Sequence, residues 1–335
     1  MQIIQNRRGF LAGAAAAGAS GLLGAPKPAW AEPPPEVTRI RTSVYPKVSD
    51  CVTPFYAAEE LLRAEGFTEV EFVQPASDAE GLRLVADGQV DIESYDAPII
   101  LQLIESGTPL KVLAGLHVGC IELLAGLHVT SVKDLRGRRV GINQLNGLGH
   151  VLLRLMAANV GVDTDRDIEW VETSNALELL AEGKIDAFLA TPPDPLIARD
   201  RKIGHPILVT ATDRPWSQYF CCLIYGSADF VSQYPVAAKR ALRALLKSVD
   251  LCVSDPQAAA RRSVEKGFAS SYDYALRTLA EARYGVWREY DPADTLTFYA
   301  LRMKELGMIT TSPNEVLAAN TDWRFVDELK RELKT

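Results

Sequence analysis

A ten-residue passage of this chain occurs twice, 95 residues apart. Residues 82–91 read LRLVADGQVD and residues 177–186 read LELLAEGKID, so leucines, alanine, an acid, glycine, a branched apolar residue and aspartate recur in register. In each copy a helical run ends at glycine, a frequent helix terminator, and a short apolar strand follows. The repeat therefore predicts two lobes built on one plan. The alternative is two unrelated βαβ units that share common helix-ending and turn residues.

The residues before each copy support two similar α/β lobes. Strands are expected at residues 40–45, 70–73, 139–142 and 168–171. Helical runs that end at Gly66 and Gly161, again 95 residues apart, separate the strands of each pair. Both halves thus read strand, loop, helix, strand, helix, glycine, strand. Two such lobes enclose a cleft, and clefts between lobes bind small molecules.

Residues 1–31 resemble a twin-arginine signal peptide and are left out of the fold prediction. Residues 6–11 read NRRGFL, a weakly apolar run follows at 12–23, and Ala29 and Ala31 offer the small residues that a signal peptidase reads. The apolar run is shorter than the roughly 20 residues that span a bilayer. We expect export to the periplasm by the twin-arginine route. The alternative is a chance arginine pair in a cytoplasmic tail.

The charge balance argues against nucleic acid or an anionic membrane surface as partner. Removal of the three basic residues of the signal segment leaves 33 basic against 43 acidic residues, which changes the net charge from −7 to −10. Both kinds of partner need basic patches. We therefore expect a small-molecule ligand, no nucleic acid and no direct membrane insertion.

The five cysteines indicate neither a disulfide framework nor a metal site. Their number is odd and CxxC spacing is absent. Cys221 and Cys222 lie in an apolar run, and free cysteine behaves as a small core residue. We expect buried structural thiols, no cofactor and no metal.

The rest of the chain predicts a discontinuous first lobe with a helical C-terminal extension. Lobe 1 is expected at residues 37–127 and 221–335, and lobe 2 at 128–220. Helices are expected at 235–253, 256–267, 273–282, 292–306 and 323–333. Asp291-Pro292 and Ser312-Pro313 read as N-caps followed by a first-turn proline.

Several short motifs, in this order, resemble the type II periplasmic binding proteins of ABC importers, more narrowly the nitrate/sulfonate/taurine and thiamine-pyrimidine-precursor binding group. The motifs are Phe55-Tyr56-Ala57-Ala58, Gly88-Gln89-Val90-Asp91-Ile92, Gly107-Thr108-Pro109-Leu110, Asp134-Leu135-Arg136-Gly137 and Gly183-Lys184-Ile185-Asp186-Ala187. The resemblance implies two α/β lobes, two crossover segments that act as a hinge, ligand capture by closure, and an inner-membrane ABC permease as partner. A monomer is expected.

Candidate ligand-binding residues follow from the strand pattern. In open α/β sheets, ligands bind beyond the carboxyl ends of strands, near helix N-termini. Trp216 and Tyr219, near the return crossing, are included because they could stack on a ring. The predicted residues are Tyr45, Asp50, Thr53, Tyr95, Asp96, Asn146, His150, Asp194, Trp216 and Tyr219. Ser94, Asn143 and Thr191 occupy similar strand-end positions.

One departure from the family pattern bears on the ligand. Sulfonate and nitrate binders place small hydroxyl residues before the second-lobe helix, whereas residues 146–150 here read NGLGH. Acids stand at the strand ends instead: Asp50, Glu93, Asp96 and Asp194. Carboxylates repel anions and accept hydrogen bonds from N–H groups. A ligand with amine or ring-nitrogen groups is therefore favoured over a bare sulfonate, unless these acids face solvent or cap helices.

Two other functions stay open. The hydroxymethylpyrimidine synthases of thiamine biosynthesis share this architecture but carry a C-C-C-F-C run, of which this chain has only Phe220-Cys221-Cys222. No GxSxG, HExxH or Walker pattern is present, and no catalytic residue is predicted. The second alternative is a periplasmic sensor subunit that presents its ligand to a receptor.

Overall fold

The computed structural model of the chain describes residues 32–43, 50–75 and 78–334. From Pro35 onwards the described residues form one compact unit. The predicted signal peptide and Tyr45 lie outside the described residues. The strands are β1 (Arg39–Ser43), β2 (Glu69–Val73), β3 (Ile92–Asp96), β4 (Leu110–His117), β5 (Glu122–Ala125), β6 (Arg138–Ile142), β7 (Ile168–Glu172), β8 (Ala187–Ala190), β9 (His205–Val209) and β10 (Cys222–Ser227).

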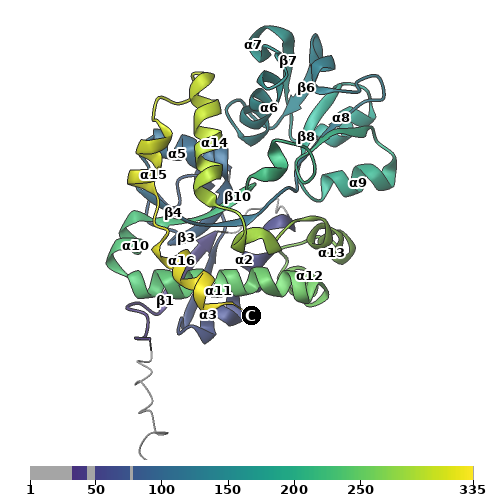
Figure 1. Ribbon diagram of the computed structural model, residues 1–335. Helices are drawn as coiled ribbons and strands as arrows, with labels where there is room; N and C mark the ends of the chain where they lie inside the picture. Colours follow the sequence, from purple (N-terminus) through teal and green to yellow (C-terminus); the bar gives the residue numbers. More distant parts are fainter. Residues whose placement is uncertain (1–31, 44–49, 76–77, 335) are drawn as a thin grey trace, which may run out of the picture. The chain divides into compact units, whose positions relative to one another are not determined.

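Helices alternate with these strands and then follow them, as Figure 1 shows. Those between strands are α2 (Thr53–Ala57), α3 (Glu59–Ala64), α4 (Asp78–Gly81), α5 (Ala97–Glu105), α6 (Leu148–Ala158), α7 (Thr164–Asp167), α8 (Ala176–Ala181) and α9 (Asp194–Arg201). Those after β10 are α10 (Ala228–Gln233), α11 (Pro235–Ser254), α12 (Pro256–Glu265), α13 (Tyr272–Glu281), α14 (Pro292–Glu305), α15 (Pro313–Asn320) and α16 (Arg324–Glu332). Short 3-10 helices are η1 (Asp50–Val52), η2 (Val132–Leu135), η3 (Trp216–Gln218) and η4 (Gly285–Arg288).

The described strands pair in three groups. One sheet has the order β7-β6-β8-β5-β9, the second has the order β3-β10-β4, and β1 pairs with β2. β6 runs parallel to β7 and β8, whereas β5 and β10 are antiparallel to both of their neighbours. The predicted α/β fold class, with sheets flanked by helices, is confirmed.

The five-stranded sheet carries helices on both faces because its strands alternate in side-chain direction. Leu123 packs in the same buried cluster as the apolar residues of α6. Its neighbour Leu124 packs in a separate cluster with residues of α8 and α9, among them Leu177 and Ala198. Both faces of the sheet are therefore covered, as in the upper right of Figure 1.

The chain passes between the two larger sheets twice. Residues 118–121 lead from β4 to β5, and residues 210–221 lead from β9 back to β10. The lobe boundaries stay a prediction, although β5, which precedes the predicted boundary at residue 128, pairs with β8 and β9 of the five-stranded sheet. Two crossings of this kind are where a hinge between two lobes would lie.

The C-terminal helices are tied to the first half of the chain by packing and by charge. α11 contacts α2 and α3. The carboxylate of Glu65, which is 7% exposed, receives Arg243 Nη1 at 2.8 Å and Lys247 Nζ at 2.9 Å. The predicted N-caps are confirmed, since Asp291 accepts from the N–H of Ala293 and Ser312 accepts from the N–H of Glu315.

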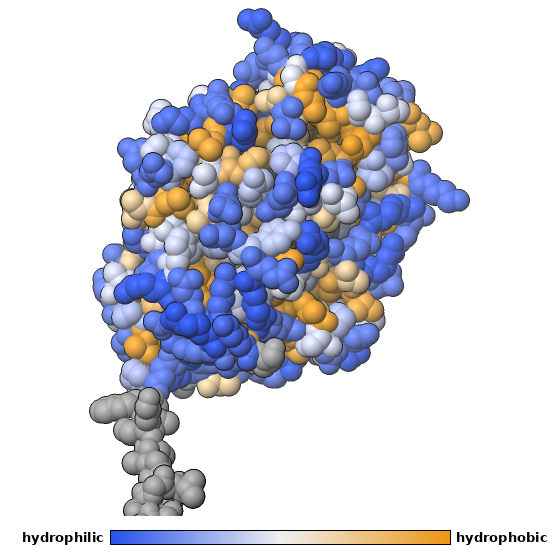
Figure 2. Space-filling model, in the orientation of Figure 1, coloured by the Kyte–Doolittle hydropathy of each residue, from blue (hydrophilic) through white to orange (hydrophobic). Residues whose placement is uncertain are grey.

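The described surface is mainly hydrophilic on the face seen in Figure 2, with scattered hydrophobic side chains between charged ones. Among the described residues, every helix is too short or too polar to cross a lipid bilayer.

Candidate functional site

A cavity of about 210 Å³ lies where the carboxyl ends of strands from both larger sheets meet. Ser94, Tyr95 and Asp96 line it from the end of β3. Asn143 and Gln144 line it from the loop after β6, and Thr191 from the end of β8. Asp96 and Thr191 are 95 residues apart, so the internal repeat places equivalent positions on the same cavity. The volume suits a small organic molecule or ion.

The N-terminus of α6 supplies backbone donors to this cavity. The helix begins after Gly147, which has no side chain to cap it, and Leu148 and Gly149 line the cavity. The first N–H groups of a helix have no intrahelical partner and carry partial positive charge. This end of the cavity therefore favours an acceptor or a partly negative group of a ligand.

Asp96 places a carboxyl group, which accepts hydrogen bonds when ionised, in the same cavity. Burial raises the pKa of Asp96 to about 7, although the Cys221 thiol, which donates to its Oδ1 at 3.2 Å, works in the other direction. Near neutral pH this carboxyl group can thus accept a hydrogen bond when ionised or donate one when protonated. Together with the amides of Asn143 and Gln144, it suits a ligand that has both N–H donors and acceptors.

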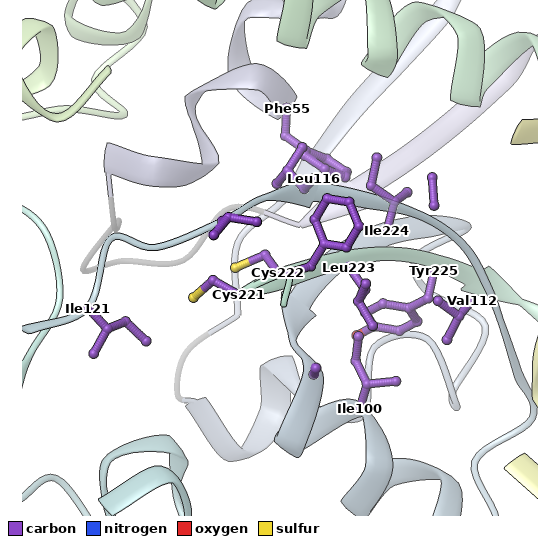
Figure 3. Close-up of a cluster of buried hydrophobic side chains, with 14 of the residues drawn as sticks. Phe55, Ile100, Val112, Leu116, Ile121, Cys221, Cys222, Leu223, Ile224 and Tyr225 are labelled. Atoms are coloured by element: carbon purple, nitrogen blue, oxygen red, sulfur yellow. The ribbon is translucent and has the colours of Figure 1, made fainter. Parts of the chain in front are cut away.

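Thiols form part of the cavity wall. Cys51, Cys120 and Cys222 line it together with the apolar side chains of Val52 and Ile121. Figure 3 shows Cys221 and Cys222 at the start of β10, beside a cluster of buried aliphatic and aromatic side chains. The Sγ atoms of Cys120 and Cys221 are 3.7 Å apart.

The other acids predicted at strand ends do not line this cavity. Glu93 is 1% exposed and accepts from Ser43 Oγ at 2.5 Å and Tyr225 Oη at 3.1 Å, inside the core. Asp194 begins α9 and donates its N–H to the carbonyl of Thr191 at 3.0 Å. Of the four acids predicted at strand ends, Asp96 alone lines this cavity.

Asp50 and Thr53 lie just behind the cavity wall. Both are buried, and Thr53 Oγ1 donates to the carbonyl of Asp50 at 2.7 Å, which joins η1 to the start of α2. Burial raises the pKa of Asp50 to about 7, and the charge of Cys51 adds to this. The two residues that stand between Asp50 and Thr53 in the sequence, Cys51 and Val52, line the cavity.

His150 and Asn146 belong to the supporting structure of α6. The N–H of Asn146 donates to Nδ1 of His150 at 3.0 Å, and the imidazole meets the ring of Trp170 edge-on at 4.7 Å. Burial lowers the pKa of His150, and the charge of Arg154 adds to this. Neither His150 nor Asn146 lines the cavity, because the first turn of α6 turns Leu148 and Gly149 toward it instead.

Trp216 and Tyr219 lie beside a second, much smaller pocket that also touches Asp96. The ring of Tyr219 stacks on Phe298 at 4.0 Å, and Trp216 meets the same ring edge-on at 5.8 Å. These aromatic residues pack against α14 and do not line the larger cavity. Of the predicted residues that the structure describes, Tyr95 and Asp96 line the larger cavity.

Gln144 and the cysteines are among the cavity residues that the sequence interpretation did not assign to a ligand. Cys51 directly follows Asp50, a predicted site residue, and Cys120 follows the strand that ends at His117. Their strand-end positions were an available signal, but apolar neighbours made a core role the simpler interpretation.

The comparison with known proteins agrees with this geometry. Residues 51–259 match the model of the family described as NMT1/THI5 like. The chain belongs to that family. The match covers more than half of the sequence, and it confirms the resemblance inferred from the motifs. This NMT1/THI5-like protein also has 29% identity over 147 residues to a putative thiamine biosynthesis protein of Haemophilus influenzae. That alignment covers 41% of this chain and only 46% of the relative's length.

Solved structures show the same fold. The periplasmic nitrate-binding protein NrtA of Synechocystis PCC 6803 superimposes with a TM-score of 0.76 at 16% identity, over 90% of each chain. A putative periplasmic sulfonate-binding protein of Methylobacillus flagellatus KT superimposes with a TM-score of 0.66 at 19% identity, over 89% of this chain and 95% of the other. At these identities the likeness establishes a periplasmic-binding-protein fold and leaves the ligand open.

Proposed function

We propose that this protein is the periplasmic substrate-binding component of an ABC importer and that it captures a small nitrogen-containing heterocycle or amine. The observation that carries the ligand class is the half-buried carboxyl of Asp96 in a cavity that Asn143 and Gln144 also line. These groups pair with N–H donors and ring acceptors. A bare nitrate or sulfonate has no N–H donor and could pair only with the protonated form of Asp96.

Capture is proposed to occur by closure of the two sheets around the ligand. The cavity takes its lining from both larger sheets, and the segments 118–121 and 210–221 are its two connections. A ligand that contacts both sides stabilises the closed arrangement by its differential affinity for that state. An inner-membrane permease would then recognise the closed form.

Export by the twin-arginine route is part of the same proposal. It rests on the sequence NRRGFL, the short apolar run and the small residues before Glu32. A fusion of residues 1–40 to a reporter that is active only after folded export would test it. Replacement of Arg7 and Arg8 by lysine is expected to abolish export, and unchanged export would contradict this route.

A role next to thiamine chemistry is the second candidate. A relative named for thiamine biosynthesis supports a thiamine precursor, such as its pyrimidine half, as ligand, and an enzyme of the hydroxymethylpyrimidine-synthase type is the alternative. The two are separable, because a binding protein returns its ligand unchanged. Recovery of altered pyrimidine after incubation would favour the enzyme.

The decisive experiment is a thermal-shift panel on the chelator-treated full chain with pyrimidines, amines, alkylsulfonates and nitrate. A ligand at 100 times its dissociation constant adds about 2.7 kcal/mol of stability, which should raise the melting temperature by roughly 5 °C. A shift with a pyrimidine or amine supports the proposal. A shift with sulfonate or nitrate alone would keep a binding protein and overturn the assigned chemistry.

Site variants then locate the ligand. We expect Asp96→Asn and Asn143→Ala to weaken binding at least tenfold without unfolding the protein. Asp87→Asn, an exposed acid outside the cavity, is the control. Equal affinity in the wild type and in both site variants would place the ligand elsewhere.

A further inference from the structure

Two thiols and an imidazole converge behind the wall of the cavity. Sγ of Cys51, Sγ of Cys120 and a ring nitrogen of His117 all lie within 4.8 Å of one another. They come from three separate segments, namely η1, the end of β4 and the crossover that follows it. Cys51 and Cys120 line the cavity, so the cluster can be reached from it.

His117 carries two polar ring nitrogens into the buried interior of the protein. Its side chain is 0% exposed, and within residues 32–43, 50–75 and 78–334 no hydrogen bond of normal geometry reaches either ring nitrogen. Leaving a buried polar group without a partner destabilises a protein. The ring meets Tyr284 edge-on at 5.4 Å, which orients it without satisfying either nitrogen. A cation bound to one nitrogen would supply the missing partner.

Cys120 is held in a conformation that side chains resist. Its φ is +96°, in a region favoured by glycine, and it follows Gly119, whose φ is +80°. A non-glycine residue in such a region is strained, and strain of this kind concentrates at functional sites. The strained backbone brings the thiol of Cys120 to the cluster.

Cys51 is the third member of the cluster. It is buried, at 3% exposed, and its Sγ lies within 4.8 Å of Sγ of Cys120 and of a ring nitrogen of His117. The hydroxyl of Tyr284 donates to the Cys51 carbonyl at 2.8 Å and fixes the backbone there. Thiolates are the species that bind metals.

We propose that Cys51, His117 and Cys120 form a binding site for one thiophilic cation of the Zn²⁺ class. Two sulfur ligands and one imidazole suit Zn²⁺ and disfavour Mg²⁺ or Ca²⁺, which prefer oxygen. Three protein ligands leave a fourth position, which the cavity side would supply. Such a site would differ from the expectation of no metal drawn from the cysteine spacing, and it could form whether or not the proposed organic ligand binds.

The test is a zinc titration of the full chain, reduced and freed of metal by a chelator, with a thiol assay that first accounts for all five cysteines. Zinc is added in competition with a chromophoric chelator, and Co²⁺ is used in parallel because thiolate ligation produces a charge-transfer absorption. We expect one equivalent to bind. Cys252→Ser is the matched control, since Cys252 is also buried, at 1% exposed, but lies in α11 away from the cluster.

Cys51→Ser and Cys120→Gly test the assignment. Because loss of a group that only orients a ligand costs 10–100-fold in affinity, loss of a ligand should cost more than about 100-fold. Cys120→Gly removes the thiol and relieves the positive φ, so the metal-free variant should melt at the wild-type temperature or above it. This keeps the test valid even where Cys51→Ser folds poorly.

Each outcome of the titration either supports or overturns the metal site. Stoichiometric binding that both site variants lose and Cys252→Ser keeps would establish the site. Absence of stoichiometric binding, or binding equal in Cys120→Gly and wild type, would overturn it. Since the organic panel is run after chelation, failure of the metal site leaves the proposed transport function untouched.

Discussion

Asp91 and Asp186, which are 95 residues apart, accept equivalent hydrogen bonds from an arginine in the two halves of the protein, and Asp186 also bonds to Nε2 of His128. Asp91 Oδ2 accepts from the N–H of Arg41 at 2.8 Å, and Asp186 Oδ2 accepts from the N–H of Arg139 at 2.9 Å. Each arginine also places its guanidinium on the same aspartate. The aspartate of the sequence repeat therefore has the same structural role in both halves. We call this aspartate–arginine contact a clasp: it joins the start of β3 to β1 in one half and the start of β8 to β6 in the other.

Removing the charge from either clasp should destabilise the protein. In Asp91→Asn and Asp186→Asn, an amide N–H₂ group faces the guanidinium donors and one charge-assisted bond is lost. We expect the free energy of unfolding to fall by about 1.5–3 kcal/mol, measured by urea denaturation. The exposed Asp87→Asn is the control. A loss below 0.5 kcal/mol in both variants would show that the clasp is only a consequence of the fold.

Gly115 should not tolerate a side chain. A Cβ at this position in β4 would come within 2.3 Å of the ring of Phe220, which is fully buried. We expect Gly115→Ala to cost about 1–3 kcal/mol, because a packed core must shift to accept the methyl group. Gly149→Ala, where an added Cβ meets no atom within 4 Å, should be neutral or stabilising. Adding Phe220→Leu to Gly115→Ala should cost less than Phe220→Leu costs alone, and additive losses would contradict the contact.

Asp96 should reduce stability as the pH rises. Burial raises its pKa in the folded protein to about 7, above its unfolded value of about 3.9. Between these values the folded state holds a proton that the unfolded state has released, so the contribution of Asp96 to stability falls from about pH 4 to pH 7 and is constant above that. Relative to wild type, Asp96→Asn should therefore gain stability across this range. A pH-independent difference between their melting temperatures would contradict the raised pKa.

Glu105 should have the opposite effect. Its carboxylate accepts from the hydroxyls of Thr310 and Thr311, both at 2.6 Å, and from their N–H groups at 2.8 Å and 3.0 Å. These bonds lower the pKa of Glu105 to about 2. The stabilisation is present above about pH 4.5 and is lost as the pH falls toward 2.

Glu105→Gln should thus melt below wild type at pH 7 and converge with it near pH 2. Glu289→Gln is the comparison. Glu289 is the C-cap residue of η4, and no comparable set of hydrogen bonds to its carboxylate is found among the described residues. Parallel melting curves at all pH values would show that the threonine contacts do not depend on charge.

Much of the fold was predictable because its signals are local. The repeat, the glycine terminators and the N-caps at Asp291 and Ser312 each depend on residues close together in the chain. Helix α15 was not predicted as a helix, although its cap was recognised, because its eight residues show little apolar periodicity. The placement of β5 in the five-stranded sheet depends on pairing with β8 and β9, which a strand pattern alone does not reveal.

The candidate site was predictable only in part. Tyr95 and Asp96 line the cavity because strand ends meet at one edge of a sheet, which is a rule of topology. His150 and Asn146 were expected there too, but the direction of a side chain on the first turn of a helix depends on what packs beneath it, here Trp170. The other three predicted acids do not line the cavity. Glu93 is hydrogen-bonded inside the core, Asp194 begins α9, and Asp50 is buried in η1.

By itself, the sequence determined two α/β halves of one plan, the caps of the C-terminal helices and the family to which the chain belongs. These follow from residue order and from periodicity over ten to twenty positions. Only the tertiary structure decided which strand-end residues share a cavity, and it alone brought Cys51, His117 and Cys120 to within 4.8 Å of one another. The physical reason is that side-chain direction and contacts between distant segments are set by packing of the whole chain, to which local patterns contribute little.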